Sequence, residues 1–400
     1  MKKTFLILGM TAAVLSSCES DDTPDIVIND NSTVNNTTIN GPGGTDPGDE
    51  VVNLSGVYTD NLTLDADTDY VITGPVLMAS GTTLSIPAGT TLRAQPVGVN
   101  AYIAIQQGAQ INASGTAQNP IVLTSNASNP GAGDWGGLVI CGRAPINSTA
   151  VGSEDTATSE VGGLSYGGNV VADNSGTVQY LRIEYAGGAI DGNAELNGLS
   201  LYAVGNGTTM DHIQIFEGSD DGVEFFGGTV NVSQVAVVNA EDDSIDWTEG
   251  YTGTLTDVYV QHGINHDKAF ECDGYNTDFS NEGGYFSAPN VNNVTVVGTG
   301  EAGTEGIRLR AGTQGIFTNV VVTNFEEAFD LDGDTGDNTT GQGVIDGLLQ
   351  VNNVTFNNVT TKLKNDTGFT FTEADFISGD GNGTGTDVSS WAAGWTVGIN

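Results

Sequence analysis

The chain has 400 residues, of which 50 are Asp or Glu and only 10 are Lys or Arg, so its formal net charge at pH 7 is −40. This charge excludes direct binding to the phosphate backbone of nucleic acids, because that interaction requires clustered Lys and Arg side chains. Hydrophobic residues make up 38% of the chain and there are 57 glycines. The composition therefore fits a folded protein with many turns rather than a disordered chain.

The start of the chain has the features of a bacterial lipoprotein signal. Lys2 and Lys3 are followed by an apolar stretch over residues 5–15 and by small residues before Cys18. The apolar stretch is shorter than the roughly 20 residues that a membrane-spanning helix needs. The tetrapeptide LSSC resembles a lipobox, which implies removal of residues 1–17 and a lipid anchor on Cys18. An ordinary signal with a chance cysteine is the alternative.

Residues 18–52 are predicted to be the lipidated cysteine and a disordered acidic tether, because they are rich in Asn, Thr, Asp, Gly and Pro and have little to bury. The segment Glu19-Ser20-Asp21-Asp22 resembles the acidic export tag of some Gram-negative lipoproteins. This resemblance implies attachment to the outer membrane with the folded part facing the cell exterior. An anchor that faces the periplasm is the alternative.

From residue 53 onward, two short motifs alternate. The first is a polar residue followed by two apolar residues that flank a variable one, and its copies begin at Tyr180, His212, Gln234, Asp257, Asn293, Asn319 and Asn353. The second is a small residue followed by the same apolar pair, and its copies begin at Gly198, Gly222, Ser244, Ala269, Gly306 and Ala328. A repeat of about two dozen residues cannot bury its apolar side alone, so neighbouring repeats must stack.

This pattern predicts an all-β fold, a right-handed parallel β-helix over residues 53–400 with irregular early coils. A leucine-rich repeat would need helical segments, and a β-sandwich would have hairpins every 8 to 12 residues or so. We expect Asn293, Asn319 and Asn353 to form a side-chain ladder at a turn. Residues 368–400 do not repeat, and we expect them, with Trp391 and Trp395, to cap the last coil.

Several segments carry a family resemblance: GTTLSIPAGT, GDWGGLVI, LRIEYAGG, DDGVEFFGGTVN and the closing WAAGWT. They resemble a family of secreted or lipid-anchored bacterial surface proteins with a pectate-lyase-like right-handed parallel β-helix, a family without an established activity. The resemblance covers most of residues 54 to 400, and it implies the same fold and location.

The repeat places acidic residues in rows on the outside of the predicted helix. Equivalent residues of adjacent coils lie about 4.8 Å apart, so Glu224, Asp246 and Glu271 should form one row. Four more acids begin the same strands: Asp220, Asp221, Asp242 and Asp243. Close carboxylates favour bound cations or raised pKa values, and oxygen-only clusters suit Ca²⁺. The preferred interpretation is a solvated acidic face; the alternative is a Ca²⁺ site at Asp221, Glu224, Asp243 and Asp246.

Two of the few basic residues, Arg308 and Arg310, lie on one predicted strand between acidic neighbours. The expected neighbours are Glu271, Asp273, Asp330 and Asp332. One interpretation is an ion-pair grid that joins three coils. The other is a binding site for a carboxylated or hydroxylated sugar, walled by insertions at 273–289 and 333–343. Four aromatic residues of the first insertion would stack on sugar rings or pack the loop onto its scaffold: Tyr275, Phe279, Tyr285 and Phe286.

The preferred function is a non-catalytic binding module for a glycan, a partner protein or Ca²⁺. A polysaccharide lyase or glycoside hydrolase remains the alternative, because three segments resemble polygalacturonase motifs: Asp242-Asp243, Gln261-His262-Gly263 and Arg308-Leu309-Arg310. The match departs from the family at Arg310, which replaces a lysine, and at His262, which follows the other motif. Cys272 takes an inward position, so a buried thiol is expected rather than a disulfide with Cys141.

Overall fold

The computed structural model describes residues 51–191, 194–333 and 339–399. The predicted signal peptide, Cys18 and the tether up to residue 50 lie outside the described residues. The first strand begins at Val51, two residues before the expected start of the folded domain. None of the described helices has the length and apolar character that a membrane crossing requires.

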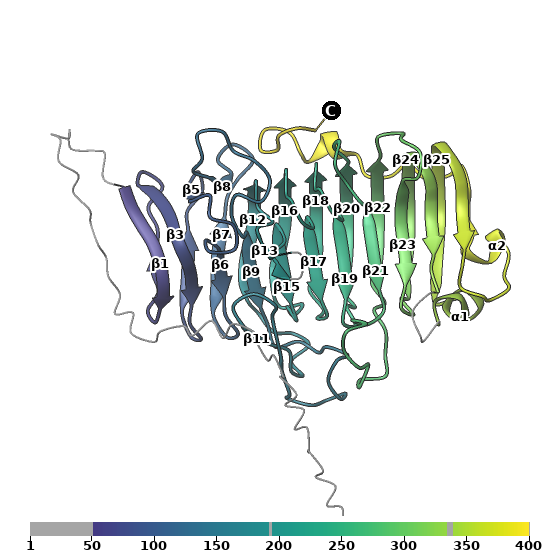
Figure 1. The fold of residues 1–400 in the computed structure, drawn as a ribbon, viewed down its shortest axis with the longest axis horizontal. Coiled ribbons are helices and arrows are strands. Elements are labelled where there is room, and N and C mark those ends of the chain that lie inside the picture. The colour runs from purple at the N-terminus through teal and green to yellow at the C-terminus, as the bar shows by residue number, and fades with distance from the viewer. Residues whose placement is uncertain (1–50, 192–193, 334–338, 400) are drawn as a thin grey trace, which may run out of the picture. The chain divides into compact units, whose positions relative to one another are not determined.

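The strands stack in parallel into one continuous 22-stranded sheet that winds into coils (Figure 1). Each coil has three walls. Wall 1 contains β2 (Leu62–Thr63), β4 (Thr83–Ile86) and β7 (Gln110–Ser114). Wall 2 contains β5 (Thr91–Ala94) and β8 (Ile121–Ser125). Wall 3 contains β6 (Ile103–Ile105), β9 (Leu138–Cys141), β15 (Leu199–Tyr202), β17 (Val223–Phe226), β19 (Ile245–Thr248), β21 (Phe270–Asp273) and β23 (Glu305–Arg310).

Longer strands turn a corner and contribute to more than one wall. β12, for example, pairs with β7 through its first half and with β8 through its second. These strands are β1 (Val51–Tyr58), β3 (Asp69–Met78), β12 (Gly176–Glu184), β16 (Thr209–Phe216), β18 (Val232–Val238), β20 (Thr254–Gln261), β22 (Asn290–Val297), β24 (Gly315–Leu331) and β25 (Leu349–Asn365). The predicted parallel β-helix is therefore confirmed.

The first residue of the first motif forms the corner between walls 1 and 2. All seven of these residues have left-handed backbone conformations, with φ between 50° and 62°. Asn and Asp tolerate this region better than most residues, which explains why the last four copies of the motif begin with Asp or Asn. The predicted ladder forms in part: Asn319 Nδ2 donates to Asn293 Oδ1 at 2.8 Å, and Asn293 Nδ2 donates to Asp257 Oδ1 at 3.1 Å.

The alternating apolar residues of both motifs fill the inside of the coils. Trp247 is fully buried there and packs against Phe270 of the next coil, with ring centroids 6.1 Å apart. Cys272 belongs to this core, whereas Cys141 lies in a second apolar cluster. Both cysteines are free and buried, so the expected buried thiol is confirmed and no disulfide joins them.

The second apolar cluster lies outside the coil, on the outer side of wall 3. Its members include Cys141, Tyr202 and Phe226, which the insertion after β9 covers through Tyr166. The insertion contains a short antiparallel pair, β10 (Ala157–Thr158) and β11 (Ser165–Tyr166). This part of the outer side of wall 3 is therefore covered by a folded loop, under which its aromatic side chains pack.

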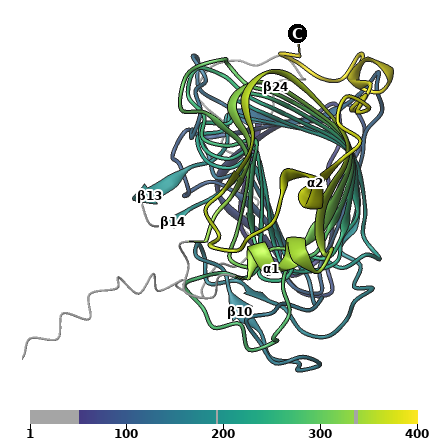
Figure 2. The same cartoon turned by 90° about the vertical axis from the view of Figure 1, so that its right-hand side faces the viewer.

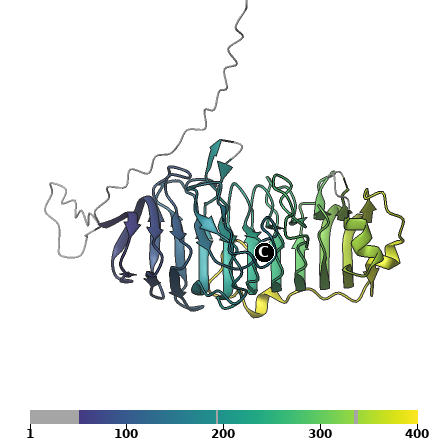
Figure 3. The same ribbon diagram turned by 90° about the horizontal axis from the view of Figure 1, so that it is seen from below.

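The end of the chain first caps the last coil and then runs back along the side of the coils. Helix α1 (Thr340–Ile345), helix α2 (Glu373–Phe376) and β26 (Ile377–Ser378) lie over the open last coil (Figure 2), where Phe376 contacts Phe329 at 5.4 Å. The remaining segment, which includes the 3₁₀ helix η1 (Val388–Ser390), runs back along the coils (Figure 3).

Trp395, which we expected in the cap, lies on the side of the coils instead. Its ring contacts Tyr180 edge-on at 5.7 Å, and its backbone carbonyl accepts a hydrogen bond from Arg182 Nη1 at 2.7 Å. Gln214 binds both backbone groups of Val397, at 2.7 and 2.9 Å. The reason is that outward polar side chains of successive coils provide partners for the backbone of this segment.

Candidate functional site

The outward residues at the second position of the wall 3 strands form a single row, which we call the wall row. Strand register places them directly opposite one another in successive coils. The row runs Ser200, Glu224, Asp246, Glu271, Arg308, Asp330 and Lys364. Positive and negative residues alternate from Glu271 onward, whereas Glu224 and Asp246 are adjacent acids. The predicted row of Glu224, Asp246 and Glu271 is thus present.

A second row, the entry row, precedes the same strands and contains Asn197, Asp221, Asp243 and Lys268. Its carboxylates accept hydrogen bonds from the backbone of the next coil: Asp243 N donates to Asp221 Oδ1 at 3.0 Å, and Lys268 N donates to Asp243 Oδ1 at 2.7 Å. Asp221 and Asp243 are only 7% and 5% exposed. Their carboxylates are therefore fixed in place by the repeat itself.

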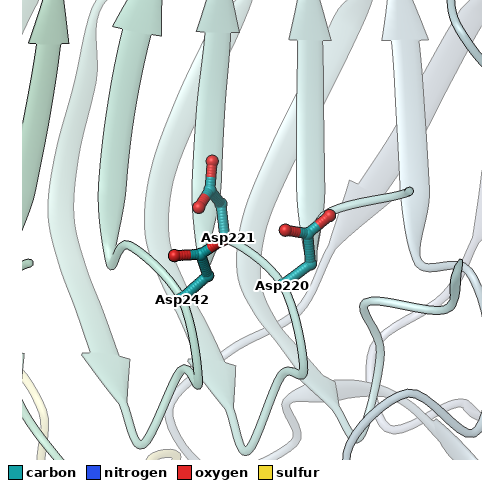
Figure 4. Close-up of side chains that lie close together, drawn as sticks. All are labelled: Asp220, Asp221 and Asp242. Carbon is teal, nitrogen blue, oxygen red and sulfur yellow. The ribbon is translucent and has the colours of Figure 1, made fainter. Parts of the chain in front are cut away.

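The two rows border a pocket of about 240 Å³. Nine carboxylic acids and two other residues line it: Glu160, Glu195, Asn197, Asp220, Asp221, Glu224, Phe226, Asp242, Asp243, Asp246 and Glu271. Oxygen atoms of Asp221, Glu224 and Asp246 lie within 4.8 Å of one another, as do those of Asp243, Asp246 and Glu271. Figure 4 shows a further group with the same spacing, Asp220, Asp221 and Asp242, from two adjacent coils.

Different partners close the two ends of this pocket. At one end, Asn197 Nδ2 donates to Glu224 Oε2 at 2.6 Å. At the other end, Lys268 Nζ lies 3.1 Å from Glu271 Oε1 and 3.8 Å from Asp243 Oδ1. Between them, Asp246 Oδ1 is buried and has no hydrogen-bond partner among the residues that the structure describes. The middle of the pocket is therefore the part where negative charge is least compensated.

Burial and mutual repulsion shift the titration of these acids. Desolvation, followed by the charges of neighbouring carboxylates, raises the pKa of Asp221 and of Asp246 well above the usual range. The pKa of Glu224 and that of Asp243 are also well above the usual range, again chiefly through burial. Burial and the nearby Glu195 raise the pKa of Asp220 to about 7. Raised pKa values of this kind favour protonation of the carboxyls or binding of a cation near neutral pH.

The family comparison agrees with this architecture. The family model described as a pectate-lyase-like β-helix domain matches residues 56–396. The chain belongs to that family. Neither a curated protein nor a solved structure shows a significant match. The pectate-lyase-like match confirms the expected fold over nearly the whole described chain, and its description names no ligand.

In this pectate-lyase-like chain the six predicted ligand residues come together as an ion-pair network. Arg310 contacts Asp273 Oδ1 and Glu271 Oε2, each at 2.6 Å. Arg308 pairs with Asp332, and Lys364 Nζ lies 3.1 Å from Asp330 Oδ2. Even so, burial raises the pKa of Asp273 to about 6. These contacts favour the ion-pair grid over a sugar site, since the guanidinium groups already have carboxylate partners.

The first insertion does not stand apart as the wall of a cleft. Asn147, from the insertion after β9, donates through Nδ2 to the carbonyls of Gly274 and Tyr285, each at 2.8 Å. Tyr275 and Phe286 pack with ring centroids 6.3 Å apart. Three of the four loop aromatics are at least partly buried and one, Phe279, is 49% exposed. In the second insertion, residues 334–338 lie outside the described residues.

Sequence reasoning missed three lining residues, Asn197, Glu160 and Glu195, and it also missed Lys268 beside the pocket. Asn197 and Lys268 occupy the same repeat position as Asp221 and Asp243, one residue before the second motif, so alignment of the repeats contains the signal for them. Glu160 and Glu195 come from segments between coils, and Glu195 lies in β14 (Ala194–Glu195), which pairs with β13 (Ala189–Asp191). No repeat predicts the position of either residue.

Proposed function

We propose that this protein is a non-catalytic binding module held on the outer membrane of a Gram-negative bacterium, and that its acidic pocket binds Ca²⁺. The observation that carries the calcium proposal is the convergence of Asp221, Glu224, Asp243 and Asp246 in one pocket. The carboxylate oxygens of each group lie within 4.8 Å of one another, and at that limit two unit charges repel by about 3.5 kcal/mol at an effective dielectric constant of about 20. A divalent cation with oxygen ligands removes this repulsion at several carboxylates at once.

Lys268 supports the presence of a cation position between the two rows. Its ammonium lies between Asp243 and Glu271, where it neutralises one carboxylate from each row. The corresponding position one coil earlier lies between Asp221 and Asp246, and the entry row has an aspartate there in place of lysine. A free cation would take the role that the lysine side chain performs in the next coil.

The calcium proposal is tested by thermal unfolding of the purified full-length protein with a chelator and with Ca²⁺. A ligand that binds only the folded state raises the free energy of unfolding, by about 2.7 kcal/mol at a concentration one hundred times its Kd. The melting temperature rises as a result. Asp246→Asn should abolish the calcium response, whereas the exposed Asp60→Asn should retain it. No shift in the wild-type protein at millimolar Ca²⁺ would remove calcium from the proposal.

The anchor and the location rest on the sequence of the first residues. Cleavage before Cys18 and lipidation of its thiol and amine would attach the β-helix to the membrane, since several acyl chains bind far more firmly than one. Mass spectrometry of the N-terminal peptide and the membrane partition of Cys18→Ser test the anchor. Digestion of intact cells with an external protease tests surface exposure, and full protection of the β-helix would place it in the periplasm instead.

A polysaccharide lyase or glycoside hydrolase is the second candidate, and Asp220 favours it. A carboxyl whose pKa is about 7 can keep a proton at neutral pH, which a general acid requires. Against this, His262 is not part of the described pocket lining, and burial lowers its pKa to about 3. New reducing ends or unsaturated products from acidic or neutral polysaccharides, lost in Asp246→Asn or Arg308→Ala, would place catalysis first.

A further inference from the structure

A second pocket, with no lining residue in common with the acidic one, lies where the chain leaves β9. Its volume is about 270 Å³. The turn after β6, the residue after Gly142 and two arms of the following insertion form its walls. Its lining residues are Gln107, Arg143, Glu154, Thr156, Gly167, Gly168, Asn169 and Val170.

Arg143 differs from every other base in the described part of the chain. Seven of the eight described Lys and Arg residues form salt bridges: Arg93, Arg182, Lys268, Arg308, Arg310, Lys362 and Lys364. Arg143 forms none with any described residue. Exposure does not explain this difference, because Arg93 and Lys362 are 41% and 39% exposed and still pair with carboxylates. Arg143 is therefore the one described base whose charge has no described carboxylate partner within salt-bridge distance.

The surroundings hold Arg143 in position. Its backbone N–H donates to Asp173 Oδ2 at 2.9 Å, and its carbonyl accepts from Val170 N at 2.9 Å. Its guanidinium lies against Gly108, where a Cβ atom would come within 2.3 Å of Nη2. Gly108 has a φ of 84°, which favours glycine, and hydrogen bonds hold the backbone of Arg143 at both its N–H and its carbonyl.

A side-chain amide fixes the walls of the pocket in the same way. Gln107 Nε2 donates to the carbonyls of Gly142 and Gly167, at 3.1 and 2.8 Å. Gly167 and Gly168 have φ values of 95° and 142°, which favour glycine, so no side chain fills this wall. A pre-formed pocket of this kind binds with less loss of conformational entropy than a flexible one.

Glu154 lines the same pocket, and its carboxylate forms no salt bridge with Arg143 or with any other described base. The two opposite charges therefore line one pocket without pairing with each other. We propose that this pocket binds a small molecule that carries a carboxylate next to a hydrogen-bond donor, either a hydroxyl or an ammonium group. Arg143 binds the carboxylate through two parallel hydrogen bonds, and Glu154 accepts a hydrogen bond from the donor.

Calorimetric titration of the purified full-length protein with acetate, glycolate and L-serine tests this site. Glycolate or serine should bind at least tenfold more tightly than acetate, and preference between these two distinguishes a hydroxy acid from an amino acid. Arg143→Gln should weaken their binding at least tenfold, Glu154→Gln should remove the preference over acetate, and the control Arg93→Gln should leave both unchanged. Absence of binding throughout the millimolar range, or equal binding by wild type and Arg143→Gln, would overturn the proposal. The titration does not depend on calcium, so its result tests this proposal separately from the proposal that the acidic pocket binds Ca²⁺.

Discussion

The ammonium of Lys268 lies 3.1 Å from Oε1 of Glu271, three residues further along the same coil. The lysine thereby places a positive charge between the entry row and the wall row, and it closes one end of the acidic pocket. One coil earlier the same two positions hold Asp243 and Asp246, and no described base reaches them as closely.

We expect Asp243→Lys to supply this missing charge. By analogy with Lys268, the new ammonium would lie between Asp221 and Asp246. The substitution also removes the carboxylate that accepts a hydrogen bond from Lys268 N. The comparison is therefore made with Asp243→Asn, whose amide oxygen remains an acceptor. In a chelator, the melting temperature of Asp243→Lys should fall less with rising pH than that of Asp243→Asn. Equal pH dependence of the two variants would contradict the cation position.

The stability of the calcium-free protein should fall as pH rises. The folded-state pKa of Asp220 is about 7, above its ordinary value of 3.8, so between these values the folded protein binds more protons than the unfolded chain. Unfolding then releases protons, and the free energy of unfolding decreases with pH across this window. Asp221 and Asp246 act in the same direction because their pKa values are also raised.

Denaturant titrations between pH 4 and pH 8 or so, with chelator and with Ca²⁺, measure this dependence. Calcium should flatten the fall as pH approaches neutrality, since the bound ion stabilises the ionised carboxylates. A calcium-free stability that rises steadily over the whole range would show that the pocket is not the dominant titrating element of the fold.

Removal of the Trp395 side chain should detach the C-terminal segment from the side of the coils. Trp395 is 1% exposed and packs against Tyr180 and His212, and truncation of a buried tryptophan to alanine costs about 3–5 kcal/mol. We expect Trp395→Ala to lower the melting temperature clearly more than Trp391→Ala, because Trp391 is only partly buried. Protease cleavage after residue 378 should increase in the first variant alone.

Arg310 should be important for stability rather than for ligand binding. It pairs with Asp273 and Glu271, and loss of one partner of a buried ion pair costs about 3–5 kcal/mol because the remaining charge is left uncompensated. We expect Arg310→Met to lower the free energy of unfolding by an amount near the low end of this range, since Arg310 is partly exposed. Arg310→Met/Asp273→Leu should recover part of the loss, and additive effects of the two changes would argue against direct coupling.

The sequence predicted those parts of the site that the repeat encodes. Glu224 and Asp246 occupy equivalent positions in successive coils. Parallel stacking brings equivalent positions together whatever the length and conformation of the turns between them. Glu160 could not be found in this way, because it lies in an insertion whose path depends on packing over Tyr202 and Phe226. The prediction that Trp395 lies in the cap was wrong for a similar reason. A non-repeating segment is placed by tertiary contacts, and the repeat of the sequence carries no information about these.

Because the strands of wall 3 pair only with those of the adjacent coils, the acidic pocket has a length that can be changed by whole units. Asp221 and Asp243 are separated by 22 residues and joined by one side-chain-to-backbone hydrogen bond, so a tandem copy of residues 221–242 would extend both rows in register. Each added unit would bring another pair of carboxylates from the entry and wall rows. In such a protein, the number of bound ions would grow with the number of coils inserted.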